Sequence, residues 1–111
     1  MQMNTLDDQV TVCPQIAVAD VAEIKALGFT GLMCNRPDHE DPGQPTWAEI
    51  EAAAQAAGMK TYFLPVTSRE EADSAAEGFA TALKENEKLF AYCRSGTRCQ
   101  LIYMAAMARG A

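Results

Sequence analysis

One stretch of the sequence decides the fold: residues 89–98, which read LFAYCRSGTR. Its first four residues form an apolar run typical of a buried strand, and an apolar helical pattern follows the loop at residues 99–109. A strand, a glycine-bearing loop and a helix in this order aim several backbone N–H groups at one point before the helix. The sequence therefore predicts an anion-binding loop between a buried strand and a buried helix.

Cys93 stands where this loop begins, so its sulfur is a candidate for the bound anion. A thiolate in such a place can have a pKa of ~3.5 to 7.5, because the helix dipole favours the charged form. Arg98 closes the loop, and its guanidinium can bind a second anion through two hydrogen bonds. The other members of the predicted anion-binding loop are Arg94, Ser95, Gly96 and Thr97. The pattern predicts a cysteine nucleophile; the alternative is a buried structural cysteine beside solvated arginines.

The composition predicts one globular domain spanning residues 1–111, with 49% apolar and 22% charged residues. Its formal net charge of −6 argues against nucleic acid as a partner, because phosphate contacts need clustered Lys and Arg. The same net charge gives an anionic substrate no long-range attraction. Affinity for a small anion must therefore be local, and the loop with two arginines supplies it.

The N-terminus and the cysteines indicate the compartment. Residues 1–8 show no basic segment followed by an apolar one, and no apolar run approaches the ~20 residues of a membrane helix. We therefore expect a cytoplasmic protein without a membrane segment, in which the four cysteines are reduced. The cysteines lack C-x-x-C spacing, so we expect neither a bound metal nor another cofactor.

Strand and helix patterns alternate along the chain. Short apolar runs predict strands at residues 9–12, 30–34, 61–64 and 89–92. Capping-box spacings predict three helix starts: Asp20 with Glu23, Thr46 with Glu49, and Ser68 with Glu71. This alternation predicts a single α/β domain with a central, mostly parallel sheet of about four strands flanked by helices. Ligands of such sheets bind beyond the carboxyl ends of the strands, which is where Cys93 lies.

With these residues in place, the chain resembles the bacterial phosphatase-like domains of unknown function 442, which also open the beta-lactamase-hydrolase-like proteins. The matching segments are residues 14–16 (PQI), 28–29 (GF), 35–38 (NRPD), 42–45 (PGQP), 65–66 (PV) and 93–98 (CRSGTR). The resemblance implies a cysteine-phosphatase fold related to the protein-tyrosine and dual-specificity phosphatases. It also implies Cys93 as the nucleophile, the loop from Arg94 to Arg98 as the anion cradle, and a metallo-hydrolase as functional partner.

Two positions depart from the family pattern. Tyr92 stands where the family usually has a histidine that helps to organise the loop, which predicts a less acidic Cys93 than in relatives. Cys99 stands where phosphatases usually have a serine that assists the leaving thiolate. A cysteine does so less well, but it introduces a candidate redox partner for Cys93.

The first functional hypothesis is a phosphatase that acts on a small phosphate ester. Cys93 would attack phosphorus to form a thiophosphate, Arg98 and the loop N–H groups would stabilise the oxygens, and water would release phosphate. A general acid must protonate the leaving oxygen. Asp38 is the first candidate because its loop should lie at the same edge of the sheet, and Glu40 and Asp41 come next. The alternative for Asp38 is a carboxylate that caps a turn.

The loop at residues 35–45 also offers candidate substrate contacts, namely Asn35, Arg36 and His39. Arg36 would either extend the anion site or pair with a carboxylate of its own loop, Asp38 or Glu40. The alternative for His39 is an exposed loop residue.

The second hypothesis is a rhodanese-type sulfurtransferase that takes sulfur from a sulfane sulfur donor. Phosphatase loops usually place five residues between cysteine and arginine, whereas this chain places four between Cys93 and Arg98. A smaller loop suits a smaller group, such as the outer sulfur of a persulfide on Cys93. This reaction needs no general acid.

The third hypothesis is a redox-sensing or anion-binding module with little turnover. Cys93 and Cys99 lie across a short loop, so oxidation would join them if their Cα atoms lie within ~7 Å. Packing in the first helical turn is the alternative for Cys99. Cys13 and Cys34 each end a predicted strand at the same edge, where they would act as resolving thiols or, as we expect, as small core residues.

Overall fold

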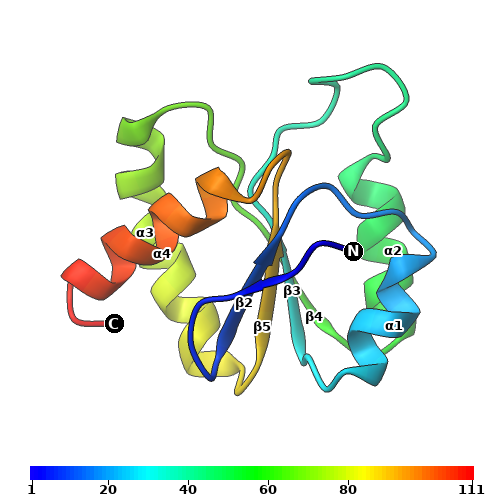
Figure 1. Ribbon diagram of the computed structural model, residues 1–111, viewed down its shortest axis with the longest axis horizontal. Helices are drawn as coiled ribbons and strands as arrows, with labels where there is room; N and C mark the ends of the chain where they lie inside the picture. The colour runs from blue at the N-terminus through cyan, green and yellow to red at the C-terminus, as the bar shows by residue number, and fades with distance from the viewer.

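The computed structural model describes residues 1–111 as a three-layer α/β domain with a five-stranded sheet in the middle (Figure 1). The strands are β1 (Asn4–Thr5), β2 (Val10–Cys13), β3 (Gly31–Cys34), β4 (Lys60–Phe63) and β5 (Leu89–Tyr92). Their order in the sheet is β1-β2-β5-β3-β4. All neighbours are parallel except β1, which runs antiparallel to β2. The predicted α/β fold with a mostly parallel sheet is confirmed.

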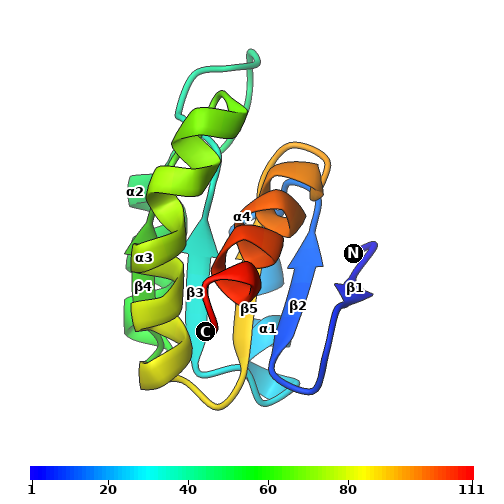
Figure 2. The same ribbon diagram turned by 90° about the vertical axis from the view of Figure 1, so that its left-hand side faces the viewer.

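Helices cover both faces of the sheet in pairs (Figure 1, Figure 2). They are α1 (Asp20–Ala26), α2 (Trp47–Ala56), α3 (Arg69–Glu85) and α4 (Thr97–Ala108). Helices α3 and α4 share one hydrophobic core with the sheet, and α1 and α2 share the other. This burial on two faces explains why the central strands are continuously apolar. None of the helices combines the length and the apolar character that a membrane span requires.

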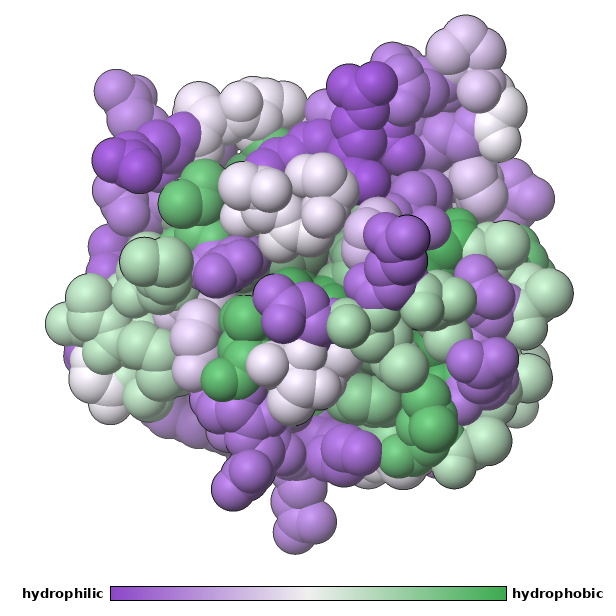
Figure 3. Space-filling model, viewed as in Figure 1, coloured by the Kyte–Doolittle hydropathy of each residue, from purple (hydrophilic) through white to green (hydrophobic).

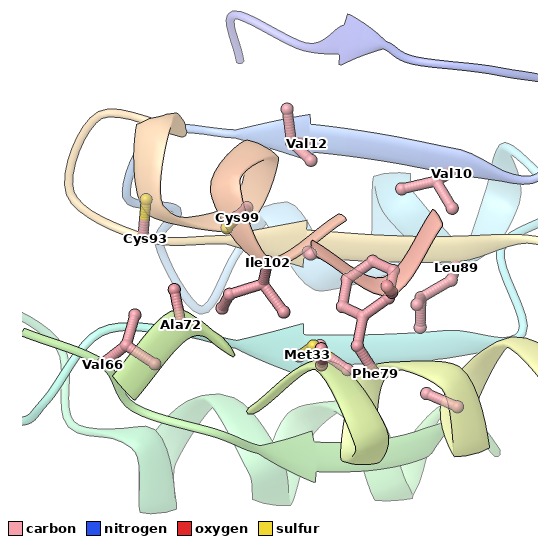
Figure 4. Close-up of a cluster of buried hydrophobic side chains, with 14 residues drawn as sticks. Val10, Val12, Met33, Val66, Ala72, Phe79, Leu89, Cys93, Cys99 and Ile102 are labelled. Carbon is pink, nitrogen blue, oxygen red and sulfur yellow. The ribbon is translucent and has the colours of Figure 1, made fainter. Parts of the chain in front are cut away.

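Strand β5 lies at the centre of the sheet, where it pairs with β2 on one side and β3 on the other. Its first and third residues enter the core under α3 and α4, and its second and fourth enter the opposite core. The alternation continues past the strand, so Cys93 joins the first core beside Cys99 and Ile102 of α4 (Figure 4). The topology thereby brings Cys93 and the first turn of α4 together.

The sheet has one strand more than the sequence predicts. Strand β1 lies at the edge, where Asn4 and Thr5 pair with Val12 and Thr11. Both residues of β1 are exposed and polar, so no apolar alternation marks them in the sequence. Their strand conformation comes from pairing with β2, which a local pattern cannot reveal. The other four strands lie within one residue of their predicted positions.

Two helix starts differ from the prediction. The N-cap of α1 is Ala19, which makes no side-chain cap, and Asp20 instead accepts a hydrogen bond from the Ala17 N–H at 2.8 Å. The predicted capping box of this helix is therefore wrong. Helix α4 begins at Thr97, two residues earlier than its apolar pattern predicts, because Gly96 ends the loop in a left-handed conformation with φ 92°.

The other two predicted helix starts are confirmed. Thr46 and Glu49 form a complete capping box at α2, in which each side chain accepts from the other residue's backbone N–H. At α3, the Ser68 hydroxyl accepts from the Glu71 N–H as predicted. The Glu71 carboxylate instead accepts from Thr67, one residue before the cap.

Replacing Ile102 with alanine is expected to lower the free energy of unfolding by about 2–5 kcal/mol. Ile102 is fully buried between α4 and the sheet, so the truncation leaves a cavity under the helix that follows the Cys93 loop. Urea denaturation followed by circular dichroism measures the loss. Met104, on the same helix, is 57% exposed, and its replacement by alanine should change stability by less than ~0.5 kcal/mol. Equal losses in both variants would contradict this packing.

Candidate active site

Four loops meet at the edge formed by the carboxyl ends of the parallel strands, at the top of Figure 1. Backbone hydrogen bonds join them: the Cys93 N–H donates to the Cys13 carbonyl at 3.2 Å, and the Val66 N–H donates to the Asn35 carbonyl at 3.1 Å. Hydrophilic side chains gather along this edge of the surface (Figure 3). Segments far apart in the sequence thus form one polar site, as the strand order requires.

The loop after β5 folds around the sulfur of Cys93. The Gly96 N–H donates to Sγ at 3.0 Å, and the N–H groups of Ser95 and Cys99 donate to it as well. The positive φ of Gly96 directs its N–H inward, and any other residue would be strained in this conformation. Cys93 itself has no exposed surface. The backbone therefore surrounds this sulfur with the donors that an anion requires.

These donors lower the pKa of Cys93 to about 5. The largest contribution is a hydrogen bond from the Cys99 thiol; burial opposes it, and the backbone donors of Cys99, Gly96 and Ser95 add to it. Cys99 is fully buried, which raises its own pKa well above the usual value, so its thiol remains a protonated donor. Cys99 thus supplies a donor at the position where the family resemblance implies a serine. The thiolate is the stable form of Cys93 at neutral pH.

Arg98 reaches from the first turn of α4 to the loop after β3. Its Nη1 and Nη2 donate to Oε2 and Oε1 of Glu40 at 2.9 and 2.7 Å, and Nη1 also donates to the Val66 carbonyl at 2.9 Å. The hydrogen bonds from Arg98 are the main reason that the pKa of Glu40 is lowered. The same pairing raises the pKa of Arg98, which remains a cation. A two-pronged ion pair therefore fixes the end of this guanidinium.

Arg36 is a buried link within the same edge, with a side chain only 3% exposed. Its Nε donates to Glu40 at 2.8 Å, its Nη2 to Asp41 at 2.6 Å and its Nη1 to Gln15 at 2.9 Å. Of the two pairings predicted within its loop, the one with Glu40 is formed, and Asp38 binds elsewhere. Arg36 therefore organises the loop, and its burial keeps the guanidinium out of direct contact with a substrate in this arrangement.

Each of the three candidate general acids is engaged by another group. Asp38 accepts from the Trp47 N–H at 2.8 Å, so its carboxylate holds the start of α2 and does not cap a turn of its own loop. Asp41 pairs with Arg36 and with Arg94, whose Nε lies 3.2 Å from Oδ2 of Asp41. Glu40 lies between two guanidinium groups. None of these carboxylates stands free above Cys93 as a proton donor.

The other predicted site residues divide into buried and exposed groups. Asn35 is fully buried, its Nδ2 donates to the Leu64 carbonyl at 3.0 Å, and its Oδ1 has no partner. His39 is exposed and has a positive φ of 66°. The hydroxyls of Ser95 and Thr97 lie 3.1 Å apart at the exposed side of the loop. No group of three or more His, Cys, Asp or Glu side chains is arranged to hold a metal ion.

Two groups that hold the site were not singled out from the sequence. The Gln15 amide oxygen accepts from Arg36, and the Val66 carbonyl accepts from Arg98. Both residues lie in segments that carry the family resemblance, which assigned them no role. Every residue has a backbone carbonyl, so the sequence cannot indicate that the one of Val66 binds an arginine. A glutamine amide likewise indicates no role until its hydrogen-bond partner is known.

Cys13 and Cys34 lie in the hydrophobic core under α1 and α2, on the opposite face of the sheet from Cys93. Each is 2% exposed, so the prediction that both are small core residues is confirmed. Tyr92 also enters that core, and burial raises its pKa. Its hydroxyl interacts with Cys34, so it does not replace the family's histidine at the loop. Of the other three cysteines, only Cys99 shares a core with Cys93.

A comparison with protein families gives this geometry a context. Residues 2–110 match the family described as the phosphatase-like domain of Beta-lactamase hydrolase-like proteins. The chain belongs to this family. A Beta-lactamase hydrolase-like protein of Agrobacterium fabrum is 33% identical over 105 residues, which cover 94% of this chain and 24% of that protein. This phosphatase-like domain thus spans about a quarter of the length of the curated relatives it matches.

Solved structures show the same fold. A candidate phosphatase from Neisseria meningitidis is 32% identical and superimposes with a TM-score of 0.81, covering all of this chain and 90% of that one. The protein Tk-PTP, at 18% identity, gives a TM-score of 0.62 over 95% of this chain and 80% of its own. The domain therefore has the fold of the tyrosine-phosphatase-like proteins.

The ultraviolet absorbance of the Cys93 thiolate is expected to rise with pH around a midpoint of about 5, because the loop donors stabilise the charged form. Since the pKa is lowered, the thiolate is present above this midpoint and is lost as pH falls through it. The difference between wild-type protein and Cys93→Ser isolates this thiol from the other three. A wild-type midpoint near ~8.5, the ordinary value for a cysteine, would contradict the proposed donors.

The donor role of Cys99 has a matched pair of variants. Cys99→Ala removes the thiol that contributes most to the low pKa of Cys93, so the midpoint should move to higher pH. Cys99→Ser keeps a donor and should move it less. If both variants keep the wild-type midpoint, the side chain of residue 99 does not set the pKa of Cys93.

Proposed function

We propose that the domain is a cysteine-dependent phosphatase that acts on small phosphate esters. The observation that carries this proposal is the Cys93 sulfur, held as a thiolate by the N–H groups of its own loop at a strand–helix junction. The thiolate attacks phosphorus, a thiophosphate on Cys93 forms as the ester oxygen leaves, and water then releases phosphate and restores the thiolate. Membership in a phosphatase-like family and the fold support it.

The charges that develop in this reaction lie on the phosphoryl oxygens. Backbone N–H groups of the loop and the Arg98 guanidinium are the donors available to them. Arg98 remains a cation, and fixed donors of this kind need no reorganisation as the reaction proceeds. Arg94, 65% exposed in its side chain, adds a second positive charge at the mouth of the loop. The substrate is therefore a small anion, although the net charge of the chain is negative.

Because Asp38, Glu40 and Asp41 are all bound by other groups, no free general acid is available to protonate the leaving oxygen. Asp38 would have to release the Trp47 N–H and take up a proton before it acts as general acid. Glu40 has a lowered pKa and is ionised at neutral pH. The preferred substrates are then esters whose leaving group is stable as an anion, such as aryl phosphates. Alkyl phosphates, which depend on protonation of the leaving oxygen, should react much more slowly.

A second candidate function is sulfur transfer, which two observations favour. The loop places four residues between Cys93 and Arg98, and Cys93 has no exposed surface, so the cradle suits a single added sulfur atom. The Cys93 thiolate would take the outer sulfur of thiosulfate, forming a persulfide as sulfite leaves. A thiol or cyanide acceptor would then remove that sulfur and restore the thiolate. Neither step requires a general acid.

The cellular setting is part of the proposal. A cytoplasmic location would keep the four free cysteines reduced, as the thiolate mechanism requires. The curated relatives are about four times longer than the stretch they share with this domain, so those proteins contain further sequence beside it. We propose a metallo-hydrolase as the functional partner.

A parallel assay of the reduced protein tests both functions. One arm follows phosphate release from an aryl phosphate, and the other follows thiocyanate formation from thiosulfate and cyanide. Phosphate release alone supports the phosphatase, and thiocyanate alone supports sulfur transfer. Cys93→Ser should be inactive in whichever arm the wild type turns over. Activity in neither arm, or full activity in Cys93→Ser, would contradict a cysteine-dependent enzyme.

Arg98→Ala should lower kcat/KM by about 10²–10³-fold, the usual cost of one oxyanion donor. The loss is expected because Arg98 is the one fixed cation that closes the Cys93 loop. Arg109→Ala, at the far end of the same helix, changes charge equally and should leave kcat/KM unaltered. An Arg98→Ala enzyme as active as wild type would exclude this guanidinium from the reaction.

A further inference from the structure

A continuous chain of alternating charges links both arginines of the Cys93 loop to the loop after β3. Each consecutive pair in it is an ion pair of 2.6 to 3.2 Å. Its members, in order, are Arg94, Asp41, Arg36, Glu40 and Arg98. With three guanidinium groups and two carboxylates, the chain keeps an excess positive charge at the mouth of the site. Local anion affinity thus persists despite the ion pairs.

Glu40 binds the end of the Arg98 guanidinium, which is formed by Nη1 and Nη2. The two oxygens of Glu40 accept from Nη1 and Nη2, which form the end of the group. The Val66 carbonyl takes a second hydrogen of Nη1. A guanidinium has five N–H donors, so the Nε–H and one Nη2–H of Arg98 have no protein partner. These two donors form the side edge, which matches two oxygens of a tetrahedral oxyanion.

Arg36 supplies the positive charge that offsets Glu40, so that Arg98 can still attract an anion. A lone Glu40–Arg98 pair would be neutral and would attract an anion weakly. Arg36 donates to the same Glu40 oxygen that faces Arg98, so the carboxylate is shared between two cations. Because the side chain of Arg36 is 3% exposed, it is a fixed internal cation and solvent screens it little. Arg98 therefore keeps its orientation and still attracts an anion electrostatically.

We infer that Glu40 is the positioning residue of Arg98: it holds the end of the guanidinium so that the side edge stays free for the oxyanion of the substrate, with Arg36 as buried counterion. The inference rests on the proposed function, since it concerns the same anion site. It gives a specific role to a residue that the sequence suggested as an alternative proton donor or as an ion-pair partner of Arg36. The opposing view is that Glu40 is itself a competitor that occupies the place of the substrate anion.

The sign of one measurement separates these views. Glu40→Gln removes a negative charge beside the anion site, so simple electrostatics and the competitor view both predict tighter anion binding. If Glu40 positions Arg98, the amide pairs with only one guanidinium nitrogen, and anion binding weakens. We expect the Kd for inorganic phosphate or thiosulfate, measured by calorimetry, to rise about tenfold. Glu77→Gln, an exposed residue of α3, is the charge-matched control and should bind as wild type does.

A double-mutant cycle tests whether Glu40 acts through Arg98. In the wild-type background, Glu40→Gln should lower kcat/KM by roughly 10- to 100-fold, because a misplaced donor loses transition-state contacts. In the Arg98→Ala background, the same substitution should cost nothing further. The thiolate titration of Cys93 should remain at its wild-type midpoint in Glu40→Gln, since Glu40 does not contact that sulfur. That result would exclude a general collapse of the site.

The opposite outcomes overturn the inference. Tighter anion binding in Glu40→Gln would make Glu40 a competitor, and equal losses in both backgrounds would mean that it acts independently of Arg98. A proposed function that fails is distinguishable, because the wild type itself would then lack both activities. The calorimetric arm needs no turnover and still tests the positioning role in that case.

Discussion

Backbone N–H groups converge on the sulfur of Cys93, and the rest of the site depends on this convergence. It exists because β5 is the central strand and ends where α4 begins, with Gly96 in a left-handed turn between them. The alternation of side chains along β5 then places Cys93 in the core under α4, where Cys99 adds a thiol donor. The fold thus stabilises a negative charge on this sulfur inside a chain whose net charge is already negative.

The sequence predicts most strongly what adjacent residues determine. The apolar run before Cys93, the glycine and the apolar helix after it define the strand, the loop and the helix, and the structure has all three. Strand β1 and the cap of α1 could not be predicted, because the first depends on pairing with β2 and the second on a backward bond from Asp20. The propensities of neighbouring residues predict neither this strand pairing nor this hydrogen bond.

The polar partners show the same division. Spacing placed Arg98 at the cradle, but its pairing with Glu40 joins positions 58 residues apart and follows from the strand order. Likewise, the sequence leaves Asp38 open to a role as an acid or as a capping carboxylate, and only the fold brings it to the Trp47 N–H. In the folded protein, the three carboxylates predicted as general acids are thus bound by other groups. Cys93 is left with hydrogen-bond donors and arginine cations around it. That environment suits attack on a small anion whose leaving group needs no proton.

The most direct test of the central claim is to trap the covalent intermediate. Turnover with an aryl phosphate or with thiosulfate is stopped by rapid quenching, and the cysteine-bearing peptides are identified by mass spectrometry. We expect an adduct on Cys93 alone, a phosphoryl group in the first case or one sulfur atom in the second. Turnover with Cys93 unmodified, or an adduct on Cys13, Cys34 or Cys99 instead, would show that Cys93 is not the nucleophile.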